Sequence, residues 1–154
     1  MIVEAQVTLH GSKAAVWSVI TDIAHGAELI RGIERIEIVH TPGQGLVGLR
    51  WRETRLLFGK AATVEKWITA ATEHEGYTTR AESDGFAFLT TLGITEGADG
   101  LVLTSAHESQ PQTFLARVQM IPMGLFFRGV IRKAILEDLN DLKAAVEGTT
   151  RFPG

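Results

Sequence analysis

Three side chains in this 154-residue chain place a proton-exchanging or hydrogen-bonding group among apolar neighbours: Glu53, Tyr77 and His107. Glu53 comes two residues after Trp51, so the two side chains share one face of a strand. A carboxylate on a buried face has to be paired, hydrogen-bonded or raised in pKa, because its desolvation is costly. Two interpretations of Glu53 follow: an ion pair with Arg55 or with an arginine of another strand, or a general acid or base.

His107 ends an alternating strand face that includes Leu103 and Ser105. An imidazole on that face can exchange a proton with a phenol or enolate of a bound molecule. The alternative is a structural histidine whose ring nitrogens are satisfied within the core. Tyr77 also has two interpretations: its hydroxyl donates to a carbonyl of a ligand, or it lies at the rim in contact with water. The catalytic residues are therefore unknown, with Glu53, Tyr77 and His107 as candidates.

Aromatic side chains are expected on the same inward faces, where they set the character of the interior. Each one by itself is interpreted as core or as the wall of a ligand pocket, because aromatic residues dominate cores as well. Beside a helix interrupted by Pro122, an apolar pocket and a filled interior are equally compatible with the pattern. Together with the polar candidates, the predicted ligand-binding residues are Trp51, Glu53, Tyr77, Phe86, Phe88, His107, Phe126 and Phe127.

The composition argues against several classes of partner and chemistry. Lys and Arg number 15 against 18 Asp and Glu, for a net charge of −3, whereas strong nucleic-acid binding needs clustered cations. The local basic cluster of Arg50, Arg52 and Arg55 is interpreted as a solvated strand face in preference to a phosphate site. The chain has no Cys, which excludes disulfides, thiolate catalysis and cysteine zinc sites.

Metal and cofactor motifs are missing from the sequence. The five histidines are far apart and form no His-x-x-x-His pair, and no acidic loop accompanies them. No Gly-x-Ser-x-Gly elbow indicates a hydrolase, and Gly43-Gln44-Gly45 belongs to a turn rather than to a nucleotide-binding loop. We therefore expect neither a metal nor a cofactor.

Nothing in the sequence predicts a membrane-embedded protein. No apolar run approaches the ~20 residues of a membrane span, and residues 1–5 lack a basic leader and an apolar signal core. We expect a cytoplasmic protein without stable membrane insertion. The oligomeric state is open between monomer and homodimer, since Trp67 is either part of a dimer patch or a ring that lies on the sheet.

The period of the apolar residues predicts the scaffold that positions these candidates. Residues 2–9 alternate as a half-buried strand, and a helix with Ser12 as its N-cap follows over 13–22. A second short helical segment lies between Gly26 and Gly32. A bulge near Gly59 or Gly76 would exchange the inward and outward faces beyond it. Six strands with short connections are predicted. The first runs from Ile33 to the turn at 41–45, and the other five cover 46–58, 62–71, 76–82, 86–95 and 101–108.

One long amphipathic helical segment over 112–147 closes the chain, with apolar residues at spacings of three and four. Pro122 predicts a kink or brief break near Met120 to Met123. A helix of that length needs a large apolar surface, which the strands can supply only by curving around it. The sequence thus predicts one α+β domain over 1–148 and a flexible tail over 149–154.

This order of elements resembles the START-related helix-grip superfamily, also called SRPBCC, along nearly the whole chain. Gly48-Leu49-Arg50-Trp51-Arg52-Glu53 is similar to the Gly-x-Arg-x-Arg-Glu strand of its polyketide cyclase/dehydrase and lipid-transport-like group. The segment from Pro111-x-Thr113 to Asp138-Leu139-x-x-Leu142-Lys143-x-x-x-Glu147 is similar to the C-terminal helix of that group. The resemblance implies a helix-grip fold: a curved seven-stranded antiparallel sheet wrapped around the long C-terminal helix, two short helices after the first strand, and a mostly apolar cavity.

Three functions remain open from the sequence. The leading hypothesis is binding or transport of a small hydrophobic or amphipathic molecule between the sheet and the C-terminal helix, with that molecule as the expected partner. The resemblance also implies, as an alternative, a polyketide cyclase or dehydratase that uses an acid or base in the cavity. The third hypothesis is a protein-interaction module with a filled core.

Overall fold

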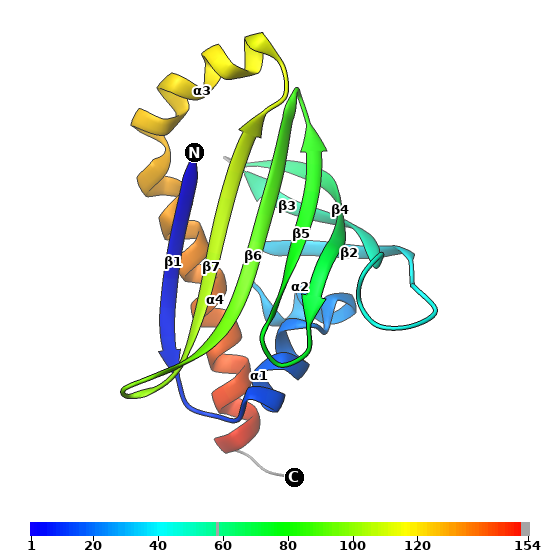
Figure 1. Cartoon of the computed structure of the whole chain (residues 1–154), viewed down its shortest axis with the longest axis vertical. Coiled ribbons are helices and arrows are strands. Elements are labelled where there is room, and N and C mark those ends of the chain that lie inside the picture. The colour runs from blue at the N-terminus through cyan, green and yellow to red at the C-terminus, as the bar shows by residue number, and fades with distance from the viewer. Residues whose placement is uncertain (58, 152–154) are drawn as a thin grey trace.

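A computed structural model describes residues 1–57 and 59–151 of the chain (Figure 1). The chain begins with strand β1 (Ile2–Leu9) and continues through helix α1 (Lys13–Ile20), the 3-10 turn η1 (Ile23–His25) and helix α2 (Gly26–Leu29). Ser12 caps α1 as expected, since its hydroxyl oxygen accepts a hydrogen bond from the Ala15 amide at 3.0 Å. The prediction of two short helices after the first strand is confirmed.

Seven strands form one sheet in the order β1-β7-β6-β5-β4-β3-β2, and every neighbouring pair is antiparallel. Because β1 and β2 are the two edge strands, the segment from α1 to α2 carries the chain from one edge to the other. At the turn between β5 and β6, Asp84 and Gly85 both have positive φ, which suits a tight hairpin. The strands after α2 are β2 (Ile33–His40), β3 (Arg50–Leu57), β4 (Lys60–Thr72), β5 (Gly76–Ser83), β6 (Phe86–Gly97) and β7 (Gly100–Pro111).

Strand β3 begins four residues later than the predicted start at residue 46. The segment before it is a loop that still contacts β4, through a hydrogen bond from the Gly48 amide to the Ile68 carbonyl at 2.9 Å and one from the Ile68 amide to the Leu49 carbonyl at 3.0 Å. Gly48 has a φ of +97°, outside the extended range of a strand. This conformation ends the regular ladder and is the reason for the shorter strand.

The inward faces of the strands agree with the alternation in the sequence. Trp51, Glu53 and Tyr77 are only 3, 6 and 6% exposed. The register shifts within β2 and, in β4, between Ile68 and Ala70, and not beside Gly59 or at Gly76, where a bulge would have exchanged the faces. No register shift therefore lies within β3, β5 or β7, and the predicted faces of these strands hold.

The long helical segment divides into α3 (Phe114–Phe126) and α4 (Arg128–Arg151). Of the kink or brief break predicted near Met120 to Met123, the break is wrong in position, because α3 passes through Pro122 and ends at Phe126. The break at Phe127 comes immediately before Arg128 and Gly129, where glycine lowers the preference for helix. The tail predicted over 149–154 stays a prediction, since α4 ends at Arg151 and residues 152–154 lie outside the described residues.

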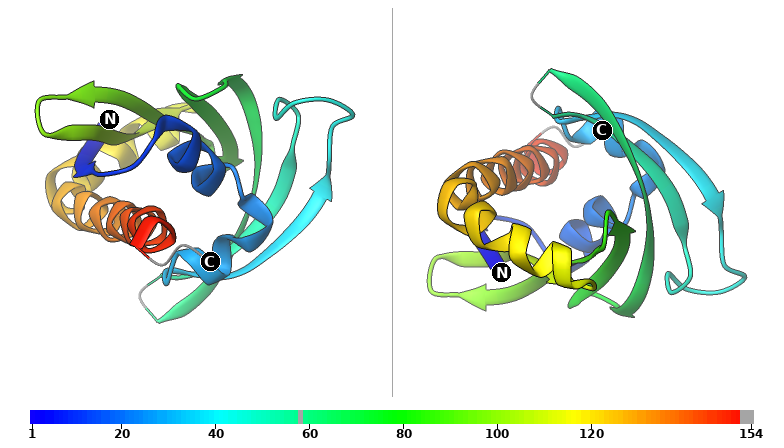
Figure 2. Two further views of the ribbon diagram at one scale, coloured as in Figure 1. Left: turned by 90° about the horizontal axis from the view of Figure 1, so that it is seen from below. Right: turned by 90° about the horizontal axis from the view of Figure 1, so that it is seen from above.

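Helices α1, α2 and α4 lie on the concave side of the sheet (Figure 2), and buried residues of α1, α4 and the strands form the core. Helix α4 packs along β1 and β7 and also contacts α1, through an apolar face at helical spacing. Within residues 1–57 and 59–151, no helix combines the length and apolar character that a membrane crossing requires. The innermost residues, each at most 2% exposed, include Val3, Leu9, Val16, Ile68, Leu103, Leu139 and Val146.

Candidate functional site

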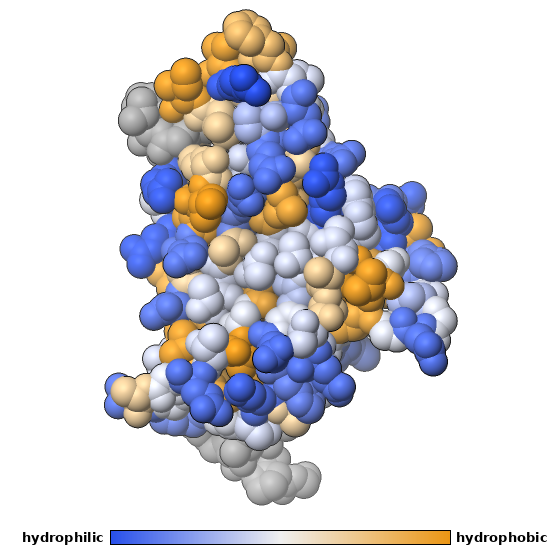
Figure 3. Space-filling view, viewed as in Figure 1, coloured by the Kyte–Doolittle hydropathy of each residue, from blue (hydrophilic) through white to orange (hydrophobic). Residues whose placement is uncertain are grey.

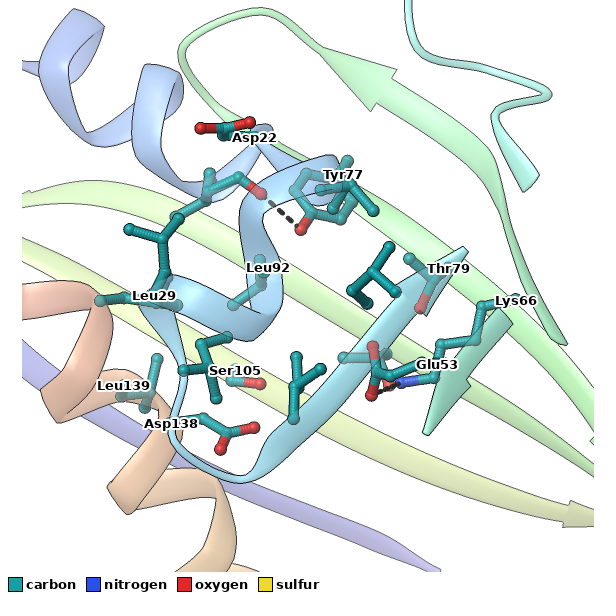
Figure 4. Close-up of a pocket in the computed structure, with 18 of the residues that line it drawn as sticks. Asp22, Leu29, Glu53, Lys66, Tyr77, Thr79, Leu92, Ser105, Asp138 and Leu139 are labelled. Atoms are coloured by element: carbon teal, nitrogen blue, oxygen red, sulfur yellow. Dashed lines mark hydrogen bonds and ion pairs between the residues drawn. The ribbon is translucent and has the colours of Figure 1, made fainter. Parts of the chain in front are cut away.

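A cavity of about 100 Å³ lies between the concave face of the sheet, the segment from α1 to β2, and α4 (Figure 4). Its walls are mainly apolar, and the residues that supply them come from every one of these elements. The polar lining comes from the middle of the sheet, from Asp138 of α4 and from Asp22 between α1 and η1. The apolar lining consists of Val19, Ile20, Ile23, Leu29, Ile30, Ile33, Ile36, Trp51, Leu92, Ile135, Leu139 and Leu142.

Glu53 forms the centre of a charged cluster in this cavity. Its Oε2 atom accepts hydrogen bonds from Arg55 Nε at 2.7 Å and from Lys66 Nζ at 3.0 Å. Its Oε1 atom accepts a longer hydrogen bond from Trp51 Nε1 at 3.4 Å. The ion-pair interpretation of Glu53 with Arg55 is therefore observed, with Lys66 of the adjacent strand as a second partner.

The cluster continues from Arg55 to helix α4. Arg55 Nη2 and Nη1 donate to the two carboxylate oxygens of Asp138 at 2.8 and 3.2 Å. This two-bond geometry is the strongest form of an arginine–carboxylate contact. Two acids and two bases thus alternate in one chain of ion pairs, Lys66–Glu53–Arg55–Asp138, that joins β4, β3 and α4.

The neighbouring charges decide the protonation of Glu53. Burial raises the pKa of this carboxyl, but Lys66 and Arg55 together outweigh burial and lower the pKa to about 2. Burial lowers the pKa of Arg55, and its contacts with Asp138 and Glu53 more than compensate, so the pKa lies above its ordinary value. Glu53 is consequently a fixed carboxylate at neutral pH, and Arg55 a fixed cation.

Tyr77 lines the cavity with its ring but uses its hydroxyl within the protein. The hydroxyl donates to the carbonyl oxygen of Ile20 at 2.8 Å, at the end of α1 (Figure 4). Burial, together with the negative charge of Glu53, raises the pKa of Tyr77 above its ordinary value. The ring also makes an edge contact with Trp17 at 6.3 Å between centroids. Neither interpretation made from the sequence, a donor to a ligand or a hydroxyl in water, matches this contact, because α1 covers Tyr77.

His107 also lines the cavity, next to Thr90 of the adjacent strand, with which it is paired in register. Burial is the main reason that the pKa of His107 is lowered, to about 4, and the cations Lys66 and Arg55 act in the same direction, against Glu53. The imidazole is therefore neutral at physiological pH. Within the part of the chain that the structure describes, neither the His107 ring nor the Ser105 hydroxyl has a hydrogen-bond partner.

Three of the predicted ligand-binding aromatics lie away from this cavity. Phe86 and Phe88 stack on each other at 5.8 Å near the start of β6, whereas the cavity is lined by Thr90 and Leu92 farther along the same strand. Phe127 lies at the junction of α3 and α4 and is 41% exposed. Strand alternation predicts a face but not a position along it, so the sequence pattern does not separate Phe86 and Phe88 from Trp51 and Tyr77. The side chain of Phe126 lies outside the described residues.

Sequence reasoning missed several cavity residues. Lys66 lines the cavity, and its neighbour Trp67 lies on the other face of β4, with the Arg50 guanidinium 4.3 Å from the centroid of its ring. Because neighbouring residues of a strand face opposite sides, an outward Trp67 would have indicated an inward Lys66. Asp138 lies in the α4 sequence between Ile135 and Leu139, an acid within an apolar helical face. Thr79 and Thr90 gave no comparable signal.

The basic cluster noted in the sequence divides between the two faces of the sheet. Arg50 and Arg52 pair with Glu65 on the outer face, at 2.7 and 3.3 Å, whereas Arg55 faces the cavity. The interpretation as a solvated strand face is right for Arg50 and Arg52 and wrong for Arg55. Among the described residues, no group of three or more His, Cys, Asp or Glu side chains is placed to hold a metal ion.

Solved structures with the same fold include two aromatase/cyclases, although each identity is low. The chain is similar to the di-domain aromatase/cyclase StfQ from the steffimycin biosynthetic pathway, with a TM-score of 0.80, 12% identity and 98% of this chain covered. It spans about half of StfQ, 52% of that chain. The Zhui aromatase/cyclase from Streptomyces sp. R1128 has a TM-score of 0.74 and 17% identity, with 100% of this chain and 98% of Zhui covered.

A START superfamily protein from Mycobacterium smegmatis has the same fold, with a TM-score of 0.69, 17% identity and 97% of each chain covered. No curated protein matches the chain. The model of the family described as polyketide cyclase / dehydrase and lipid transport matches residues 1–147, which include every element of the sheet and almost all of α4. The chain therefore belongs to the polyketide cyclase / dehydrase and lipid transport family, within the START-related helix-grip superfamily.

Proposed function

We propose that this protein binds one small, mainly apolar molecule in the cavity beside α4 and releases it unchanged. The apolar lining supports the proposal, since each buried Å² of ligand surface contributes roughly 25 cal/mol. A cavity of about 100 Å³ accommodates only part of a ligand, so the ligand either extends toward solvent or opens the space between α2 and α4. The family description supports the same class of ligand.

The polar lining suggests how the ligand is oriented. Glu53, Lys66, Arg55 and Asp138 satisfy one another and form a fixed charged wall. His107 and Ser105 have no partner among the described residues and face the same space, so they are available to a single hydroxyl or carbonyl group of the ligand. We infer a ligand with one such polar group on an otherwise apolar body.

The state of Glu53 is the observation that favours binding over catalysis. A general acid or base works best with a pKa near the working pH, and the pKa of Glu53 is held at about 2. Tyr77 is similarly unsuited to proton exchange, because burial raises its pKa and its hydroxyl donates to Ile20. Two of the three candidate catalytic residues therefore act as structural groups in this proposal.

The second candidate function is a cyclase or dehydratase in which His107 moves the proton. It is favoured by the neutral, unpaired imidazole in the cavity and by the names of the StfQ and Zhui structures. In a dehydration His107 would accept a proton from a carbon next to a ligand carbonyl and return it to a hydroxyl on the adjacent carbon, which leaves as water while a carbon–carbon double bond forms. The filled-core interaction module is disfavoured, because it requires an interior without space.

The test uses two adjacent threonines of β6 as a matched pair. Thr90 lines the cavity, whereas Thr91 is exposed on the outer face beside Thr78. Native mass spectrometry of the protein purified from its own host should find a small passenger in the wild type and in Thr91→Leu, but not in Thr90→Leu, whose larger side chain fills the cavity. A passenger that survives Thr90→Leu would place binding elsewhere and reject this cavity.

The same passenger separates the two functions. Incubated in excess with the purified protein, it should be recovered unchanged if the protein is a binder. Recovery of a cyclised product or of one that has lost water, together with loss of that conversion in His107→Gln, would replace the binding proposal with the enzymatic one.

A further inference from the structure

Helix α3 exposes an apolar face that the cavity does not use. Phe114, Leu115, Val118 and Ile121 are 81, 66, 49 and 68% exposed. We call these four residues the α3 apolar face. Apolar side chains gather over α3 at the top of the molecule, as Figure 3 shows. Single exposed apolar residues are ordinary, but four on one short helix form a patch that marks an interaction surface.

Helical geometry separates this face from the side of α3 that packs on the protein. At about 100° per residue, Phe114, Val118 and Ile121 point in nearly one direction, and Ala116 points away from them. Ala116 is 1% exposed and lies against the turn at Gly85, and the Thr113 hydroxyl accepts a hydrogen bond from its amide at 3.1 Å. The helix is thus anchored by its small residues while its large apolar residues face outward.

The charge around α3 differs from that of the whole chain. From residue 109 to residue 136 the sequence contains no Asp or Glu, although the chain as a whole has a net charge of −3. The same stretch carries four exposed cations. Two of them, Arg128 and Arg132, line a shallow surface pocket together with Glu4. The cations are Arg117, Arg128, Arg132 and Lys133.

We propose that the α3 apolar face and these four cations dock the protein reversibly on the surface of an anionic lipid bilayer. An apolar helical face bordered by Arg and Lys is the arrangement that lies in the plane of a membrane interface, with its apolar side among the headgroups and its cations at the phosphates. This docking is peripheral, and it does not depend on the cavity proposal.

Charge favours a lipid surface over a second copy of the chain. Two copies joined through α3 would bring both sets of four cations close together, and like charges at an interface oppose association. An anionic bilayer instead offers negative charge to the cations. An acidic protein partner would satisfy the same charges, so the experiment has to distinguish a lipid from a protein.

Flotation of the full chain with vesicles tests the proposal. The probes are vesicles of phosphatidylcholine alone and of phosphatidylcholine mixed with phosphatidylglycerol, each at low and at high sodium chloride. Binding is expected to the mixed vesicles at low salt, and it should weaken at high salt and with phosphatidylcholine alone. This comparison uses the wild-type protein only, so it does not depend on how any variant folds.

Matched variants locate the binding surface. Arg117→Gln should weaken binding about fivefold, and Ile121→Ser about tenfold. The controls are Lys60→Gln and Val47→Ser, since Lys60 is an exposed cation and Val47 is a 52% exposed apolar residue, both outside α3. Both controls should bind like the wild type.

Three outcomes would overturn the proposal. The first is no flotation with the mixed vesicles at low salt. The second is equal flotation of the α3 variants and their controls, which would assign binding to another surface. The third is a lipid-free dimer in analytical ultracentrifugation that Ile121→Ser dissociates, which would assign the α3 apolar face to self-association.

Discussion

Arg55 of β3 and Asp138 of α4 are joined by two hydrogen bonds, of 2.8 and 3.2 Å, although 83 residues separate them in the sequence. The contact between the sheet and α4 is otherwise mainly apolar, and apolar contacts have little directional preference. This bidentate ion pair therefore favours one turn of α4 facing the middle of the sheet. It also places the apolar residues Ile135, Leu139 and Leu142 against the cavity.

Asp138→Asn should lower the free energy of unfolding by about 2 kcal/mol, because it leaves the half-buried Arg55 with a single charged partner. The measurement is urea unfolding at pH 7. Asp141→Asn is the control in the same helix, since Asp141 pairs with Arg31, whose side chain is 83% exposed. We expect less than about 1 kcal/mol for the control. Equal losses would contradict the structural role of the Arg55–Asp138 pair.

Glu53 predicts a loss of stability in acid. Its pKa is about 2 in the folded protein and ordinarily 4.5, so its contribution is complete above pH 4.5 and is lost as the pH falls toward 2. This difference between the two pKa values of Glu53 corresponds to about 3 kcal/mol of folding stability. The free energy of unfolding should therefore differ between wild type and Glu53→Gln at pH 7 and differ less at pH 3. Glu82→Gln, at a side chain 57% exposed, serves as the control substitution. A constant difference for Glu53→Gln between the two pH values would refute the assignment.

The ring of His107 should stay neutral until the pH falls well below 6. Its folded-state pKa of about 4 is below the ordinary 6.5, so protonation favours the unfolded chain and the stability from neutral His107 is lost as the pH falls from 6.5 toward 4. Ring ¹⁵N chemical shifts measured against pH report this directly. Lys66→Met removes a nearby cation and should raise the pKa, whereas Lys60→Met should leave it unchanged. Titration of the wild-type ring near 6.5 would contradict the prediction.

Replacing leucine by alanine at one core position and at one position of the α3 apolar face should have very different effects on stability. Leu139 is 1% exposed and lines the cavity, so Leu139→Ala should reduce the free energy of unfolding by about 2–5 kcal/mol. Leu115 is 66% exposed, and Leu115→Ala should change stability by less than about 0.5 kcal/mol. Thermal and urea unfolding measure both. A large effect at Leu115 would show that its side chain is covered in the folded protein.

Much of the fold was predictable because alternation and helical spacing are local properties of the chain. Val3, Ala5 and Leu9 alternate in the sequence and are all buried in β1, and the turn at Ser83-Asp84-Gly85 connects β5 and β6 as its composition predicts. The position of the helix break was not predictable in the same way, because a proline at 122 and a glycine at 129 both weaken a helix.

The candidate site was predictable only in part. Alternation with Trp51 placed Glu53 on the inner face, and the presence of Arg55 two residues later suggested its partner. The sequence did not show that Lys66 completes the pair or that the Tyr77 hydroxyl ends at Ile20.

By itself, the sequence determined the order of the elements, the inward faces of the strands and the amphipathic character of the last helices, since each depends on the spacing of neighbouring residues. Only the tertiary structure decided which inward residues meet. Phe88 and Tyr77 face the same side of the sheet, yet only Tyr77 reaches the cavity. The pairing register of the strands and the placement of α4 set the distances between residues far apart in the chain, and those distances determine the charges and pKa values of the site.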